Sequence, residues 1–273
     1  MQPVTLHVTE YGRRIKPSLV TAFLAAIYLI IGGTAVKATE TPLIAAASST
    51  QFALEEISRE FTANTGLRIK ISYGSSGNFT RQIAQAAPFE MFISADETYV
   101  EKLEKLGLTL DHGSVYATGR VVLFVPLNSS IKVDKGLVDL KAALKDGRLK
   151  RFAMANPQHA PFGRAAKEVL ISGGLWNDIQ SKLILGENVA QAAQFASSGT
   201  TQGGLFSYSF ALVPAVKSLG HFVLLPASLH QSFHARMVLL KQAGATTTAF
   251  YQFLQSTRAR SIFDRSGFLL PQQ

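Results

Sequence analysis

Hydrophobic positions alternate between two spacings from residue 43 onward. Short apolar runs typical of buried strands are followed by segments in which apolar residues recur at helical spacing. The predicted strands are 43–47, 69–73, 91–94, 121–126, 152–155, 183–185, 222–225 and 237–240. The predicted helices are 52–61, 79–87, 99–106, 138–144, 164–172, 189–196, 247–255 and 257–263. Strands that alternate with helices predict an α/β protein with mainly parallel sheets.

The first residues follow a different pattern. Arg13, Arg14 and Lys16 precede an uninterrupted apolar run of 13 residues, and small residues surround Ala38. This order is typical of a secretory signal peptide. The run is shorter than the roughly 20 residues that span a bilayer. We therefore expect 1–38 to be a signal peptide that is cleaved after Ala38, which places the protein in the periplasm; an uncleaved membrane anchor is the alternative.

Composition and charge narrow the functional class. The chain has 273 residues, of which 47% are hydrophobic and 16% charged, so it can bury one large core or two modest ones. The absence of cysteine excludes disulfides, thiolate metal sites and a lipid-modified cysteine. The formal net charge of +9 raises the question of a nucleic-acid partner. Because part of this charge lies in the predicted signal peptide and the remaining charges are scattered along the chain, we expect no such partner.

Small and hydroxyl residues gather where predicted strands end and helices begin. Ser48 opens the sequence Ser-Ser-Thr-Gln, which fits the S-x-x-Q capping box. Further junctions of this kind lie at 74–78, 161–164 and 187–189. The N-terminus of a helix offers free N–H groups and a positive dipole end to an anion, and ligands of open α/β sheets bind where strands end. Each junction alone is equally an ordinary cap or turn, but together they indicate a site for a small anion.

Motifs of other chemistry are absent from the sequence. It contains no G-x-S-x-G elbow, no G-x-x-x-x-G-K-[ST] phosphate loop and no H-E-x-x-H. We interpret four histidines as surface or partly buried side chains rather than metal ligands or general bases: His159, His221, His230 and His234. We therefore expect a binding protein that is not an enzyme and has no cofactor.

Six groups of residues occur in an order that resembles one family. They are Ala45–Ser48; Tyr73–Gly77 with Arg81–Ile83; Phe92–Asp96; Asn156-Pro157 with Pro161–Ala166; Glu187–Val189; and Ile262-Phe263 with Gly267-Phe268. The sequence is similar in this order to the periplasmic molybdate-binding proteins of ABC importers over nearly all of 42–270. The resemblance implies a class II periplasmic-binding-protein fold, with two α/β lobes of mixed, mainly parallel sheets and the ligand in the cleft between them. It divides the chain into 39–120 (first lobe), 121–222 (second lobe) and 223–273 (return to the first lobe).

The resemblance also implies a set of site residues. Members of the family hold molybdate or tungstate with hydroxyl and backbone N–H groups, without a metal ion or a paired cation. The motifs then assign hydroxyl and backbone donors to Ser48 and Ser76, the cleft floor to Ala95, and backbone donors to Phe162 and Val189. Some relatives place a ligand tyrosine shortly after a late glycine; in this sequence Ser207 takes that register and Tyr208 follows it, so either could complete the site.

The resemblance implies that the protein captures molybdate and tungstate and delivers them to an inner-membrane ABC permease with its ATPase. We expect it to act as a monomer. Hydrogen bonds to an anion contribute about 1.5–3 kcal/mol each, so neutral donors suffice for a dianion. Cavity size would then separate molybdate from sulfate, and a lack of acceptors would exclude protonated phosphate. Two alternatives remain: a site for another oxyanion such as sulfate or phosphate, and a hydrolase that uses Ser48 or Ser76 as nucleophile, for which the sequence offers no base.

Overall fold

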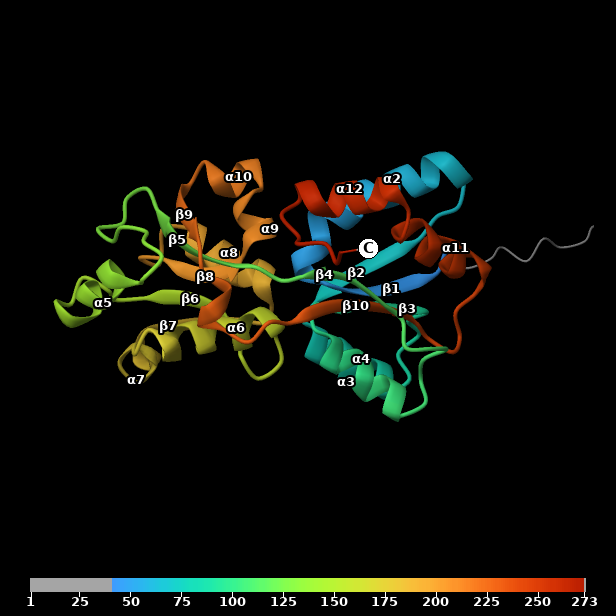
Figure 1. Ribbon diagram of the computed structural model, residues 1–273, viewed down its shortest axis with the longest axis horizontal. Helices are drawn as coiled ribbons and strands as arrows, with labels where there is room; N and C mark the ends of the chain where they lie inside the picture. The colour runs from blue at the N-terminus through green and yellow to red at the C-terminus, as the bar shows by residue number, and fades with distance from the viewer. Residues whose placement is uncertain (1–40, 273) are drawn as a thin grey trace, which may run out of the picture. The chain divides into compact units, whose positions relative to one another are not determined.

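Two five-stranded sheets form the framework of the protein (Figure 1). The computed structural model describes residues 41–272, so the expected signal peptide lies outside the described residues. Within 41–272, no helix combines the length and the apolar character needed to cross a bilayer. We call the half built on the first sheet the first lobe and the half built on the second sheet the second lobe.

The first sheet has the strand order β2-β1-β3-β10-β4. Its strands are β1 (Leu43–Ala47), β2 (Lys70–Gly74), β3 (Met91–Ile93), β4 (Ser114–Thr118) and β10 (His234–Leu239). Its helices are α2 (Gln51–Thr65), α3 (Ser76–Ala84), α4 (Glu97–Lys105), α11 (Ala245–Leu254) and α12 (Thr257–Arg265). Alternate side chains of β1 enter different cores: Ile44 and Ala46 pack under α2, α11 and α12, and Ala45 packs with α3 and α4 on the other face (Figure 1).

The second sheet has the strand order β7-β6-β8-β5-β9. Its strands are β5 (Val121–Pro126), β6 (Phe152–Ala155), β7 (Leu183–Gly186), β8 (Gly204–Ser207) and β9 (Gly220–Leu224). Its helices are α5 (Val138–Lys145), α6 (Pro161–Ser172), α7 (Trp176–Ile179), α8 (Val189–Ser197), α9 (Tyr208–Ala211) and α10 (Pro214–Lys217). Both faces belong to one continuous apolar core, which also includes Ala47 and Ala95 of the first lobe. The lobes are therefore in van der Waals contact at the ends of β1 and β3.

The prediction of two mixed sheets is confirmed, but the prediction that they are mainly parallel is wrong. In the first sheet β1 pairs in parallel with β2 and β3, whereas β10 is antiparallel to β3 and β4. In the second sheet β6 pairs in parallel with β7 and β8, whereas β5 is antiparallel to β8 and β9. Parallel pairs come from strand-helix-strand units within a lobe, and antiparallel pairs come from the strands that flank the passages between lobes.

The chain passes between the lobes twice. The first passage lies between β4 and β5, where the expected boundary at residue 120 falls. The expected return at 223 falls inside β9, which pairs with β5 from Gly220 to Leu224. The return to the first lobe therefore follows Leu224, because the hydrogen bonds of β9 keep all of this strand in the second sheet.

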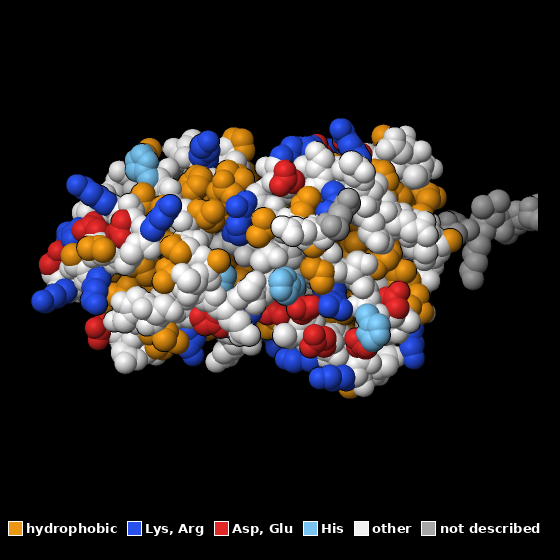
Figure 2. Space-filling view, viewed as in Figure 1, with side chains coloured by type: hydrophobic (Ala, Val, Ile, Leu, Met, Phe, Trp, Pro, Cys, Tyr) orange, Lys and Arg blue, Asp and Glu red, His pale blue; other side chains and the backbone are white. Residues whose placement is uncertain are grey.

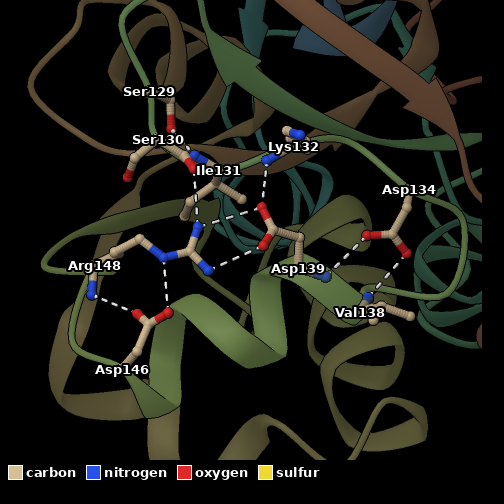
Figure 3. A network of polar contacts seen from close by, with 9 residues as sticks. All are labelled: Ser129, Ser130, Ile131, Lys132, Asp134, Val138, Asp139, Asp146 and Arg148. Carbon is tan, nitrogen blue, oxygen red and sulfur yellow. Dashed lines mark hydrogen bonds and ion pairs between the residues drawn. The ribbon is translucent and has the colours of Figure 1, made fainter.

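An ion-pair network fixes the loop before α5 to the turn after it (Figure 3). The guanidinium of Arg148 donates to Asp139 Oδ1 at 3.0 Å and to Asp146 Oδ2 at 2.8 Å. Asp134 Oδ1 accepts from the N–H groups of Gly136 and Val138, both at 2.9 Å. Hydrogen bonding to Arg148 lowers the pKa of the Asp139 carboxyl. None of these side chains lines the cavity described below, so the network stabilises the second lobe rather than a ligand.

Candidate functional site

A small cavity lies between the lobes, where the predicted junctions meet. Its empty space is about 190 Å³ when the part that opens to solvent is included. The lining residues are Ala47, Ser48, Ser49, Gly74, Ser75, Ser76, Ala95, Ala160, Pro161, Phe162 and Val189. They follow the carboxyl ends of β1, β2, β3, β6 and β7, which is where ligands bind in α/β sheets. The structure thus brings five of the predicted site residues together: Ser48, Ser76, Ala95, Phe162 and Val189.

Ser48 faces the second lobe instead of capping its own helix. The residues Ser48–Thr50 form a 3₁₀ turn, and neither this turn nor α2 has a side-chain cap, so the predicted capping box is wrong. Ser48 Oγ accepts a hydrogen bond from the N–H of Ala190 at 3.4 Å. Because the 3₁₀ turn comes between β1 and α2, the serine lies at the cavity rather than at the first turn of α2.

Ser76 and Ser75 sit at the start of α3. Ser76 is fully buried, and its Oγ accepts from the N–H of Ala95 at 3.1 Å, which joins the ends of β2 and β3. Ser75 caps α3, since its Oγ accepts from the N–H of Asn78 at 3.4 Å. Each hydroxyl still has its own proton to donate. The N–H group of Gly77 donates to the carbonyl oxygen of His159 at 2.9 Å, which connects α3 to the second lobe.

Phe162 and Val189 bring backbone donors from the second lobe. They are the second residue of α6 and the first residue of α8, positions whose N–H groups have no acceptor inside the helix. Both side chains are buried in the core of the second lobe, so the backbone is the polar part that each presents at the cavity. Together with the N-terminus of α3, these two helix N-termini supply a positive partial charge suited to an anion.

Ser49 is a site residue that the sequence reasoning missed. Its side chain is 3% exposed, it lines the cavity, and its Oγ has no hydrogen-bond partner among the described residues. A buried hydroxyl without a hydrogen-bond partner lowers the free energy of unfolding by about 1–3 kcal/mol, and most such groups in proteins have a partner. A ligand oxygen in the cavity would supply one. The only signal in the sequence was its place next to Ser48.

Ser207 and Tyr208 do not line the cavity. Ser207 Oγ lies 2.9 Å from Ser209 Oγ, and Ser209 Oγ in turn donates to the carbonyl oxygen of Ser49 at 2.9 Å. The ring of Tyr208 packs under the guanidinium of Arg120 at 4.6 Å. In this segment it is therefore the hydroxyl of Ser209 that donates a hydrogen bond to the first lobe, two residues beyond the position that register alone indicates.

The cavity is lined by uncharged residues. Among its lining residues, all within 41–272, there is no Lys, Arg, Asp or Glu. No group of three or more His, Asp or Glu in the described part of the chain has the arrangement of a metal site. An ion pair between Arg164 of the second lobe and Asp96 of the first, at 2.8 Å, connects the lobes. On the face shown in Figure 2, basic and acidic side chains are interspersed rather than gathered in one basic stripe.

The chain is similar to known proteins over almost its whole described length. Residues 42–269 match the family model for bacterial extracellular solute-binding proteins. The molybdate-binding protein ModA of Rhodobacter capsulatus is 31% identical over 256 residues, which is 93% of this chain and 98% of that protein. ModA of Azotobacter vinelandii is 32% identical over 238 residues, which is 86% of this chain and 91% of that protein.

Solved structures agree with these sequence matches. The periplasmic molybdate-binding protein of Azotobacter vinelandii superposes with a TM-score of 0.76 at 29% identity, covering 85% of this chain and all (100%) of that one. The sulfate-binding protein SubI of Mycobacterium tuberculosis shares the fold at a TM-score of 0.69 and 14% identity, covering 84% of this chain and 86% of that one. The expected kinship with periplasmic molybdate-binding proteins is confirmed, and the chain belongs to the family of bacterial extracellular solute-binding proteins.

Proposed function

We propose that this protein captures molybdate outside the cytoplasm and delivers it to an ABC-type importer, with tungstate as a second ligand and without a cofactor. One observation carries the proposal: a cavity lined by four serines and the N-termini of α3, α6 and α8 contains a buried hydroxyl on Ser49 without a partner among the described residues. Relatives named as molybdate-binding proteins give the ligand. The donors on this chain would be the four serine hydroxyls and the N–H groups of Phe162 and Val189.

The chemistry of these donors favours a small dianion without protons. Hydroxyl and N–H groups can all donate to oxyanion oxygens, and each such bond contributes about 1.5–3 kcal/mol. A ligand that carries its own proton, as phosphate does, would need an acceptor; the N–H groups offer none, so one serine would have to accept a hydrogen bond instead of donating one. Sulfate and molybdate offer equivalent acceptors, so the choice between them rests on the size of the cavity.

Export follows from the same proposal. Residues 1–38 would direct the chain to the periplasm and be removed after Ala38, so that the mature protein meets the permease and its ATPase as a soluble monomer. Mass spectrometry of the protein recovered from a periplasmic fraction tests the cleavage site. A mature chain that begins at Thr39 is expected; an intact N-terminus on a membrane-bound protein would contradict cleavage.

Thermal unfolding of the protein with molybdate, tungstate, sulfate and phosphate at equal concentration tests the ligand. A ligand at 1,000 times its Kd adds about 4 kcal/mol to the free energy of unfolding. For a chain of this size that corresponds to roughly 2–4 °C per kcal/mol in Tm. We expect a rise with molybdate and tungstate alone. A rise with sulfate or phosphate instead, or with none of the four, would contradict the proposal.

The alternative of a serine hydrolase has a separate test. Neither Ser48 nor Ser76 has a histidine within hydrogen-bond distance among the described residues. Ser75 does have one, His159 at 3.0 Å, but its Oγ is also the cap of α3. We expect no hydrolysis of p-nitrophenyl acetate above the rate of the Ser75→Ala variant. A serine-dependent rate would favour the hydrolase.

A further inference from the structure

His159 lies behind the cavity at the contact between the lobes. Its side chain follows β6 and is almost fully buried, with the residue 7% exposed. The ring nitrogen Nδ1 lies 3.0 Å from Ser75 Oγ, and Nε2 lies 3.5 Å from Glu187 Oε2. Ser75 lines the cavity, whereas His159 itself does not. The histidine can therefore act on a ligand through the serine.

The contact between His159 and Ser75 crosses from one lobe to the other. Ser75 follows β2 of the first sheet, and His159 follows β6 of the second. The backbone reinforces this contact, because the N–H of Gly77 donates to the carbonyl oxygen of His159 at 2.9 Å. The contact between the lobes thus holds the imidazole against the Ser75 hydroxyl.

The proton on the imidazole decides what the Ser75 hydroxyl can do. The carboxylate of Glu187 in front of Nε2 favours a proton on that nitrogen. If the ring is neutral, Nδ1 carries a lone pair and accepts a hydrogen bond from the Ser75 hydroxyl. The hydroxyl proton then points away from the cavity. If the ring takes up a second proton, Nδ1–H donates to Ser75 Oγ, and the hydroxyl proton of Ser75 is free for a ligand oxygen.

One carboxylate lies beside the ring. Within the described residues, Glu187 is the acidic side chain within 4 Å of the imidazole. A dianion in the cavity would add a second attraction for a positive ring. The other charged side chains on the elements packed against His159 are Arg81 on α3, Arg164, Lys167 and Glu168 on α6, and Asp96, which is paired with Arg164.

We propose that His159 is a positioning residue of the oxyanion site: binding of the oxyanion is accompanied by uptake of one proton from solvent onto the imidazole, which releases the Ser75 hydroxyl to donate to the ligand. This inference rests on the function proposed above and couples binding of the oxyanion to the uptake of a proton. The protonated ring keeps its contacts to Ser75 and Glu187, and no covalent bond changes.

Isothermal titration calorimetry of the protein with sodium molybdate tests the inference. Titrations at pH 6, 7 and 8, each in two buffers of different ionisation enthalpy, give Kd and the number of protons taken up. We expect a heat that depends on the buffer and a Kd that tightens as the pH falls, by up to about tenfold per pH unit. Binding without proton uptake would overturn this inference alone, whereas absence of any molybdate binding would overturn the proposed function with it.

Two variants locate the proton. His159→Gln keeps a polar side chain but cannot become charged, so we expect the buffer dependence and the pH slope of Kd to disappear. His221→Gln, at an exposed position on β9, is the matched control and should retain both. If His159→Gln fails to fold, Ser75→Ala serves instead, since removing the hydroxyl that His159 releases should flatten the pH profile. A pH slope that persists in these variants would overturn the inference.

Discussion

The guanidinium of Arg164 lies 2.8 Å from the carboxylate of Asp96, and the two residues belong to different lobes. The Asp96 side chain is 4% exposed, and Oδ1 of the same carboxylate caps α4 by accepting from the N–H of Thr98 at 3.0 Å. Arg164 also pairs with Glu168 at 2.8 Å, which orients the guanidinium within the second lobe. The ion pair therefore forms between two groups that each lobe holds in place, so it favours the state in which the lobes are together.

Arg164→Met should weaken molybdate binding without unfolding either lobe. The substitution leaves the buried carboxylate of Asp96 without its cross-lobe partner, a loss of roughly 1–2 kcal/mol for a pair that is partly open to solvent. We expect Kd to rise about tenfold, because the ligand would bind between the two lobes that this ion pair holds together. Calorimetry measures the change, with Lys167→Met on the same helix as control. An unchanged Kd would show that the ion pair does not contribute to closure.

Ser49→Ala should have opposite effects on binding and on stability. Removing the unpartnered hydroxyl relieves a buried polar group, so the Tm without ligand should stay equal or rise. Loss of a hydrogen bond to the anion, about 1.5–3 kcal/mol, should raise the Kd for molybdate about 10- to 100-fold. Ser218→Ala, at an exposed position, is the control and should change neither quantity. Retained affinity in Ser49→Ala would contradict the role of Ser49.

Gly77→Ala separates folding of the first lobe from approach of the second. A Cβ at residue 77 would lie 2.7 Å from the carbonyl oxygen of His159, which is too close for both to stay in place. Within α3 itself alanine is the better helix former, by about 1 kcal/mol. We expect an unchanged or higher Tm without ligand and a Kd at least about tenfold weaker. Small-angle X-ray scattering with saturating molybdate should show a more open molecule than wild type; equal scattering and affinity would contradict this account.

Much of the fold could be predicted from the sequence because its strands and helices have clear periodicities. Each predicted strand and helix is present with ends shifted by a few residues. Two strands were missed for local reasons. β4 lies at a sheet edge and mixes polar with apolar residues, and β8 has four residues and begins with Gly204. Strand direction was predicted less well, because periodicity carries no information on pairing partners.

For the candidate site too, some residues could be predicted from the sequence and others could not. Ser48, Ser76, Phe162 and Val189 lie where strands end and helices begin; local patterns indicated these junctions, and the resemblance to the family assigned the individual residues within them. Ser49 could not be distinguished from an ordinary turn serine, because its significance is an absent partner in three dimensions. The contact between His159 and Ser75 was invisible for a similar reason, since the two residues are separated by 84 positions.

Asp139→Asn should lower the stability of the second lobe and leave the site intact. Hydrogen bonding to Arg148 lowers the pKa of Asp139 in the folded protein. A carboxyl whose folded pKa is depressed contributes stability that is present above its unfolded pKa of about 3.9 and is lost as the pH falls through the folded value. Because both side chains of this ion pair are partly exposed, we expect a loss of at most about 1 kcal/mol at neutral pH.

Urea unfolding of wild type and Asp139→Asn across a pH series measures this difference. The gap between the two free energies of unfolding should be constant near neutral pH and shrink below about pH 4, where the Asp139 carboxyl takes up a proton in the unfolded chain before it does so in the folded protein. Asp178→Asn, on α7 of the same lobe, is the control, because Asp178 has no ion pair within 4 Å among the described residues. The Kd for molybdate at neutral pH should not change in Asp139→Asn, since the network does not line the cavity. A gap that stays constant down to pH 3 would show that the ion pair is not what the aspartate contributes, and a weaker Kd would show that this end of the second lobe is coupled to the site.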